Sequence, residues 1–246
     1  MQISMYPDGG GAVDDGLGQR ATWTPMTDAF ETAPFAAQAT GLRSATRTMM
    51  TNAAKLVELQ HPRPFITNAA ATHDLPSFIT SARQLHRAMM KAKQDADGAD
   101  ARLLEPEHAP SDFRTSLIFR MLEGRKQPEI IQLAHQHGDI AHIVLSEPFY
   151  QLFGLPEAGR AELQRSIARA NLIRRFERSS ARTPTMDDPL AERPNRKLAE
   201  AAADTTLAAH EAMRSDVDAS LRWFDSTLNV AAVLTGSPKE AIFNRL

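Results

Sequence analysis

The residues of this chain that are best suited to chemistry gather in one stretch, HQHGDIAH, which holds His135, His137, Asp139 and His142. Imidazole nitrogens and carboxylate oxygens ligate zinc and iron, so these residues are candidate metal ligands. His135 and His137 lie two residues apart, however, and residues so spaced do not share a helix face. The zinc-protease pattern, with a glutamate between histidines at i and i+4, is absent. The pattern therefore favours a helix–turn–helix junction in which Asp139 caps the second helix.

A metal site that drew on distant parts of the chain would add His73 and Asp74 to this cluster. The simpler interpretation of that pair is structural. Asp74 stands just before Leu75 and Pro76, where a helix is expected to begin, and aspartate is a favoured N-cap residue. We therefore expect no metal and no cofactor. The alternative is a helical metalloenzyme in which the histidine cluster holds the metal.

A basic face is the second candidate site. The planar guanidinium of arginine matches the oxygens of a phosphate group, so arginines on one helix face are candidate contacts to phosphate or nucleic acid. The alternative is a solvated face whose arginines pair with acidic neighbours. The basic face runs from Arg160 to Arg182, mostly on a helix expected over 156–179. The candidate contacts are five arginines within it: Arg165, Arg169, Arg174, Arg175 and Arg178.

Composition narrows the remaining chemistry. Among the 246 residues there is no cysteine, which removes disulfides, thiolate nucleophiles and cysteine-based zinc sites. The net charge of −2 gives no global attraction to nucleic acid. No phosphate-binding glycine loop, nucleophile elbow or kinase signature is present. We therefore expect a protein that is not an enzyme, with 42% apolar residues to build a core.

The elements that would position these residues are helices. Segment 128–155 is the most apolar stretch, and we expect a helix over Pro128–His137, a turn at Gly138, a helix over Asp139–Ser146 and a turn over Pro148–Phe153. Helices that are apolar on most faces must be covered nearly all round. The sequence thus predicts an all-α bundle in which the other helices pack around this short apolar pair.

Apolar residues at helical spacing predict the remaining helices. Ser111 is the expected N-cap of a helix over Asp112–Leu122, and Gly124 its C-cap. A capping box from Ser237 to Glu240 predicts a short final helix. The longer helices are expected over Thr32–Leu59, from Leu75 or Pro76 to Asp95, over 156–179, and over Arg196–Leu234. Asp97 and Gly98 are expected to end the second of these helices.

The expected domains follow from composition. The glycine- and aspartate-rich residues 1–27 predict a flexible, extended arm, and the prolines of residues 183–195 predict a linker. Between them lies a helical domain over 28–182, and residues 196–246 form the long C-terminal helix with its capping helix. The aromatic residues of the arm and the near-heptad seam of the long helix are the expected partner anchors: Tyr6, Trp23, Met213, Val217, Leu221, Phe224 and Leu228.

Segment 129–177 resembles small proteins encoded among the virion structural genes of tailed bacteriophages. The resemblance lies in the helix order and in a proline-containing turn that ends in a Leu-x-Gly-Leu-like element. The sequence departs from this pattern in the bulkier side chains of Phe149, Tyr150 and Phe153. It implies a virion-associated role, such as an internal protein ejected with the genome, and it carries over no catalytic residues. The residues that match it are Ile143, Leu145, Pro148, Leu152, Gly154 and Leu155.

Together these observations predict a structural or assembly protein of a phage virion that acts through helix–helix and arm contacts. Its partners would be other virion proteins or further copies of the chain, and we expect a homo-oligomer. The protein would be made in the cytoplasm of the bacterial host without a signal peptide, because the N-terminus is acidic and glycine-rich. No segment reaches the run of about 18 apolar residues that spans a membrane. The alternatives are a helical nucleic-acid-binding protein and the metalloenzyme.

Overall fold

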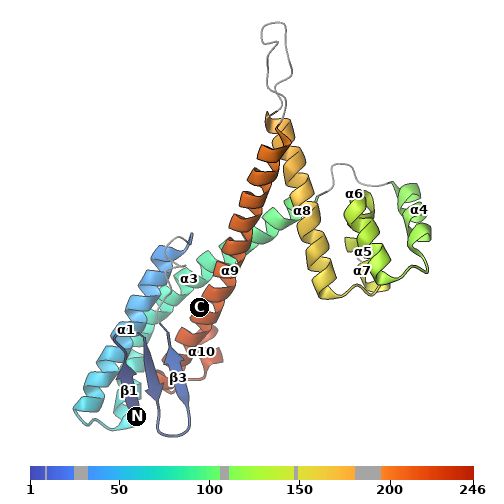
Figure 1. Cartoon of the computed structure of the whole chain (residues 1–246). Coiled ribbons are helices and arrows are strands. Elements are labelled where there is room, and N and C mark those ends of the chain that lie inside the picture. The colour runs from blue at the N-terminus through green and yellow to red at the C-terminus, as the bar shows by residue number, and fades with distance from the viewer. Residues whose placement is uncertain (9, 25–32, 106–110, 147–148, 181–194) are drawn as a thin grey trace, which may run out of the picture. The chain divides into compact units, whose positions relative to one another are not determined.

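The computed structural model describes residues 1–8, 10–24, 33–105, 111–146, 149–180 and 195–246 (Figure 1). It is mainly α-helical, with a small three-stranded sheet and a long C-terminal helix, which confirms the predicted fold class. The chain forms two compact units. The terminal unit comprises Met1–Ala96 and Ala212–Leu246, and the central unit comprises Asp97–Glu211. These boundaries differ from the predicted domains, and residues 183–194 of the expected linker lie outside the described residues.

The N-terminal segment forms a sheet, which corrects the expectation of a flexible arm. Strands β1 (Gln2–Met5), β2 (Gly11–Asp14) and β3 (Arg20–Trp23) pair antiparallel in the order β1-β2-β3. Its aspartates and glycines build the turns instead of loosening the chain. The Asp15 carboxylate accepts the N–H groups of Leu17 and Gln19 at 2.7 and 3.0 Å. Residues 25–27 of the expected arm lie outside the described residues.

The terminal unit packs helices against this sheet, and β1 lies against α1 (Ala36–Glu58) (Figure 1). Helix α1 ends at Glu58, shortly before the HPRP sequence of residues 61–64, whose prolines cannot continue a helix. The chain then continues through α2 (Arg63–Ala69) and a π-helical segment, η2 (Ala70–Asp74), into α3 (Leu75–Leu104). The last elements are α9 (Arg196–Thr235) and α10 (Lys239–Phe243).

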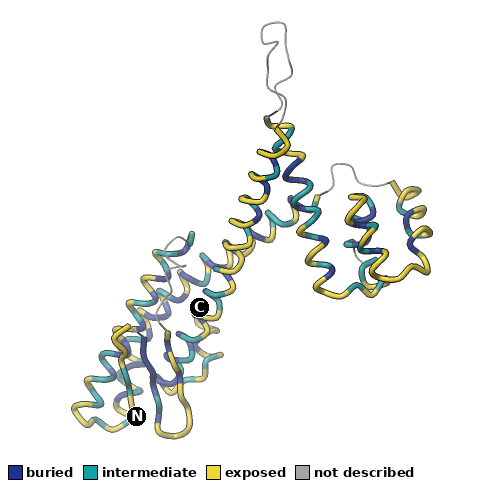
Figure 2. Tube along the Cα trace, viewed as in Figure 1, coloured by how far each residue is buried: buried dark blue, intermediate teal, exposed yellow. Residues whose placement is uncertain are grey.

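The core of the terminal unit is the largest of the clusters of buried residues in the described part of the chain. Figure 2 shows its buried positions on the facing sides of the elements. Val13 and Trp23 enter it from the sheet, Met49 from α1, Leu85 from α3 and Phe224 from α9. Each of these side chains is at most 4% exposed. The sheet side chains reach the core because alternate strand residues face one side.

Several predicted helix ends are wrong in this unit. Gly98 does not end α3, which continues to Leu104. Asp74 is not an N-cap, because it lies inside the continuous helical path, where its carboxylate accepts the Asn52 side-chain amide at 2.8 Å. The capping box at Ser237 does not form. Pro238 is the N-cap of α10, with no side-chain cap hydrogen bond.

The central unit contains α4 (Asp112–Leu122), α5 (Gln127–Gln136), α6 (Gly138–Leu145), α7 (Phe149–Leu152) and α8 (Glu157–Ser180). The predicted cap of α4 is confirmed, because the Ser111 hydroxyl accepts the Arg114 N–H at 3.3 Å. Gly124 has φ +77°, the left-handed conformation expected of a glycine C-cap. Within the described part of the chain, no helix combines the length and the apolarity needed to cross a bilayer.

The apolar pair α5–α6 is the centre of its own cluster and not of the whole chain. Ile130, Ile140 and Val144 are buried there with Leu122 of α4 and Leu163 of α8. A further cluster in this unit joins the end of α3 to α8 and the first half of α9. The prediction that the other helices pack around α5–α6 thus holds for α4, α7 and α8, whereas α1 and most of α3 belong to the core of the terminal unit.

Candidate functional site

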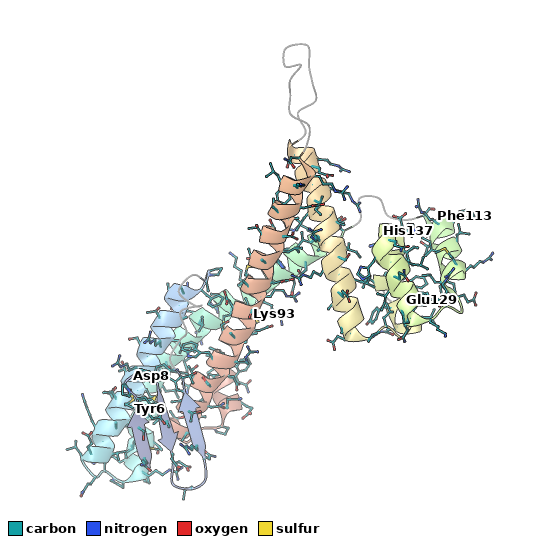
Figure 3. All side chains as sticks on the ribbon, viewed as in Figure 1. Tyr6, Asp8, Lys93, Phe113, Glu129 and His137 are labelled. Carbon is teal, nitrogen blue, oxygen red and sulfur yellow. The ribbon has the colours of Figure 1, made fainter. Side chains whose placement is uncertain are left out.

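The corner between α5 and α6 positions the histidine cluster. His135 lies in the last turn of α5 and His142 in the last turn of α6. Between the helices, His137 has an extended conformation with φ −131° and ψ 107° (Figure 3). The apolar residues of both helices bury themselves in the cluster around Ile130 and Ile140. The polar residues of HQHGDIAH consequently face away from that cluster.

The four candidate metal ligands are not arranged as a metal site: His135, Asp139 and His142 line one cavity, which His137 does not line. Asp139 forms an ion pair with Arg114 of α4, so its carboxylate is already neutralised. It lies in the first turn of α6 but does not cap that helix, which has no side-chain cap hydrogen bond. Among the residues that the structure describes, no group of three or more His, Asp or Glu side chains has the arrangement of a metal site. The geometry therefore does not favour the metalloenzyme hypothesis.

A cavity of about 340 Å³ lies between this corner and α8. The sequence predicted two separate candidate sites, and this cavity brings parts of both together. Its wall includes Ile167 and Ala170 of α8, which are apolar. The polar part of its lining comes from the corner, with His135, Gln136, Gly138, Asp139 and His142, and from α8, with Ser166, Asn171 and Arg174.

Arg174 is the cation of this cavity. Its Nη2 atom lies 3.5 Å from where a Cβ atom on Gly138 would stand, an ordinary contact distance that places the guanidinium beside the corner between α5 and α6. Among the described residues Arg174 has no ion-pair partner. Asn171 beside it is buried, and its amide donates to the Leu103 carbonyl at 2.7 Å. His135 and His142 also line the cavity, and the arrangement suits an anionic group such as a phosphate.

His135 also connects two polar residues of α8. Its Nδ1 atom lies 3.3 Å from the Ser166 Oγ, and its Nε2 atom lies 3.7 Å from the Glu162 Oε1. The order hydroxyl, imidazole, carboxylate is that of a nucleophile, its base and an orienting group. Both distances are longer than the roughly 2.6–3.2 Å of such relays, and Glu162 is exposed. The cavity therefore supports binding better than nucleophilic catalysis.

The other four candidate arginines of α8 have partners, and Arg182 of the predicted basic face lies outside the described residues. Arg165 pairs with Glu211 at 3.0 Å, and Arg169 makes a two-pronged contact with Asp204 at 2.6 and 3.0 Å. The hydrogen bond from Arg169 lowers the pKa of the Asp204 carboxyl and raises the pKa of the Arg169 guanidinium. These two arginines thus pair with acidic neighbours, as expected for a solvated helix face and not for a nucleic-acid contact. Arg175 donates to the Arg102 carbonyl, and Arg178 also has an interaction partner.

Most of the predicted partner anchors are core residues, which corrects their assignment. Trp23, Val217, Phe224 and Leu228 are buried in the terminal unit, at 1 to 4% exposure. Met213 and Leu221 are half-buried. Only Tyr6 in this group is largely exposed, at 43% (Figure 3).

The exposed apolar surface lies instead on α4. Phe113, Leu117 and Met121 are 80%, 58% and 41% exposed. Their spacing of four residues places them on one side of the helix, and we call them the α4 stripe. Figure 3 marks Phe113 at the start of this stripe. The sequence shows that α4 is apolar on more than one face. It does not show which of those faces the rest of the central unit covers.

No protein-family model matches this chain, and no curated protein or solved structure is similar enough to count as a match.

Proposed function

We propose that this chain is an assembly protein that acts by binding another protein through the α4 stripe, and that it does not work by catalysis. The observation that carries the proposal is the exposure of Phe113, Leu117 and Met121 on one side of a capped helix. Exposed apolar patches with a polar rim are typical of protein interaction sites. The opposite side of α4 packs into the central unit through Ile118 and Leu122, which holds the stripe on a fixed support.

The charges beside the stripe select the partner. At 100° per residue, Arg114 and Arg120 fall on its two sides. Arg114 pairs with Asp139, whereas Arg120 has no ion-pair partner among the described residues. A second copy of α4 would present arginines, and not carboxylates, on the two flanks of its own stripe. The surface therefore suits a helix of a different protein, with an apolar stripe and acidic flanks.

The setting of this assembly is the part that rests on the resemblance of segment 129–177 to phage virion proteins. In that setting the partner is another virion protein, and the chain is carried in the particle, as an internal or ejected protein would be. An antibody against the chain tests this setting on phage particles purified by density gradient. If the chain is missing from the particles, the virion role is wrong, whereas binding through α4 is tested separately.

A photoreactive amino acid in place of Phe113 tests binding through α4 in cells that produce the full chain. The identified partner is then purified and titrated against the wild type and against Leu117→Glu. We expect Leu117→Glu to weaken binding by tenfold or more, on the order of 1.4 kcal/mol, because a charge enters an apolar contact. Leu198→Glu is the matched control, because Leu198 is also exposed, at 68%. Equal losses in the two variants would contradict the proposal.

The cavity of the central unit supports a second candidate function, the binding of a phosphate group. The observation that favours it is the convergence of Arg174 with His135 and His142 on a cavity of about 340 Å³. The nucleic-acid alternative has less support, because Arg165 and Arg169 of the same face are engaged by Glu211 and Asp204.

A further inference from the structure

Strand β3 is an edge strand, and within the described residues it pairs with β2 alone. Figure 1 shows it as the outer strand of the sheet, with α10 nearby in the same unit. Its side chains alternate: Ala21 and Trp23 are buried, whereas Arg20 and Thr22 are exposed. An exposed edge carries backbone groups that can pair with another chain.

The register identifies these groups. The Asp15 N–H donates to the Gln19 carbonyl at 3.0 Å, so this pair is hydrogen-bonded, and hydrogen-bonded pairs alternate along an antiparallel ladder. Ala21 and Trp23 therefore bond to β2, and the N–H and C=O groups of Arg20 and Thr22 point away from it. No described residue is seen to pair with these outward groups.

A groove of about 760 Å³ runs beside this edge. One wall is β3 with its preceding turn, and the other is the last part of α9 with the segment 236–240. Neighbouring strands lie about 4.8 Å apart, so an added strand needs a clear channel next to the edge. Small residues on both walls provide it: Gly18, Ala21, Ala232, Gly236 and Ser237.

We infer that this groove receives an extended segment of a partner protein, which adds to the sheet as a fourth strand beside β3. An extended backbone is the ligand whose N–H and C=O groups match the outward pairs of Arg20 and Thr22. A sheet edge of a second copy would bring its own helices against α9 and α10. A single segment has no such bulk.

The charge of the groove selects the segment further. Arg20 is exposed and has no ion-pair partner among the described residues. Asp14 of β2 lies opposite it in the sheet, but the Asp14 Oδ1 atom accepts the Gly16 N–H at 2.8 Å. Lys239 is neutralised by Asp225 at 2.7 Å, and Glu240 disfavours further acidic residues beside α10. The preferred segment therefore places one Asp or Glu opposite Arg20.

The variant Thr22→Pro tests this inference, because it removes one outward N–H and leaves the bonds to β2 intact. Proline is tolerated at such positions of edge strands. The probes are short random peptides displayed on a carrier, selected on the full-length protein, then synthesised and titrated by fluorescence anisotropy. We expect selected peptides to bind Thr22→Pro about tenfold more weakly, because a carbonyl loses its donor. Met5→Pro on the outer edge of β1 is the matched control and should bind normally.

Two further measurements keep the test decisive. If Thr22→Pro fails to fold, peptides N-methylated at alternate residues are titrated against the wild type, and one of the two methylation patterns should abolish binding. Arg20→Glu should shift the selected peptides from acidic to basic residues at one position. Leu117→Glu should leave peptide binding unchanged, which separates this groove from the α4 stripe. If no selected peptide depends on Thr22 or on its own N–H groups, the inference is overturned.

Discussion

Asp15 is the residue whose charge contributes most clearly to the order of the N-terminal sheet. Its side chain is 2% exposed and pairs with Arg63 at 2.8 Å, in addition to the two backbone N–H groups that it accepts. The hydrogen bond from the Leu17 N–H is the largest cause that lowers its pKa, and the bond from Gln19 and the charge of Arg63 add to it. The ionised carboxylate therefore favours the folded chain.

A pH-dependent stability follows from this lowered pKa. The contribution is fully present above the unfolded value of about 3.9 and is lost as the pH falls through the lower folded value. We expect Asp15→Asn to melt at a lower temperature than the wild type at about pH 7, and the difference to close in strong acid. Thermal melts followed by circular dichroism measure both curves. Curves that stay parallel from neutral to acid pH would contradict this role.

Arg174 is the residue on which the proposed phosphate binding in the cavity of the central unit would depend. Inorganic phosphate titrated against the full chain should bind to the wild type, and Arg174→Ala should weaken binding by about tenfold, as expected for a lost charge-assisted hydrogen bond. Isothermal titration calorimetry gives the affinities. Arg165→Ala is the control, because Arg165 pairs with Glu211 and does not line the cavity. If the wild type shows no binding, the second candidate function is wrong.

Which residues the sequence placed correctly depends on the range of the interactions that hold them. Ser111 and Gly124 were predicted because a cap needs only the next few residues of the same chain. Asp139 looked like a cap by the same rule, but Arg114 from another helix engages its carboxylate. Asp74 likewise bonds to Asn52 of α1. The partner in these two cases is distant in sequence, and no local pattern encodes it.

At the scale of elements, Gly11 links strand β2 to helix α1. A Cβ atom at this position would stand 2.7 Å from the Ser4 carbonyl oxygen and 2.5 Å from the Met50 Cε. The methionine can move, but the carbonyl belongs to the paired strand β1. We therefore expect Gly11→Ala to destabilise the protein by about 1–3 kcal/mol, as overpacking does.

Urea denaturation measures this loss. Gly41→Ala is the matched control, because Gly41 lies inside α1 and a Cβ there would meet nothing within 4 Å. That substitution should stabilise the chain by up to about 1 kcal/mol through helix propensity. A neutral Gly11→Ala would mean that the N-terminal segment does not pack as a sheet.

The helices were predictable because their apolar spacing repeats over many residues, so a single exception such as Gly98 shifts an end without removing the element. The sheet was not predicted. Its strands are four residues each, and the aspartates and glycines between them are equally typical of a flexible tail. Which side of α4 is exposed was not predictable either, because Leu117 and Ile118 are equally apolar and only the packing separates them.

At the scale of the whole molecule, the chain has separate cores. The largest buried cluster lies in the terminal unit, and the cluster around α5 and α6 lies in the central unit with no residue in common. The groove beside β3 belongs to the first unit, and the α4 stripe and the cavity beside α8 belong to the second. Each unit thus has its own candidate binding surface, as the proposed role of connecting different partners requires.

Separate cores predict separate responses to mutation. Leu122 is fully buried in the central unit, so Leu122→Ala should cost about 2–5 kcal/mol there and lower the hydrogen-exchange protection of α4, α5 and α6. Met49→Ala, at a fully buried site of α1, should instead lower the protection of α1 and η2. Amide exchange read by mass spectrometry of the full chain resolves the two patterns. If either variant lowered protection equally in α1 and α5, the two cores would unfold as one, because only a shared cooperative transition spreads a local loss over both.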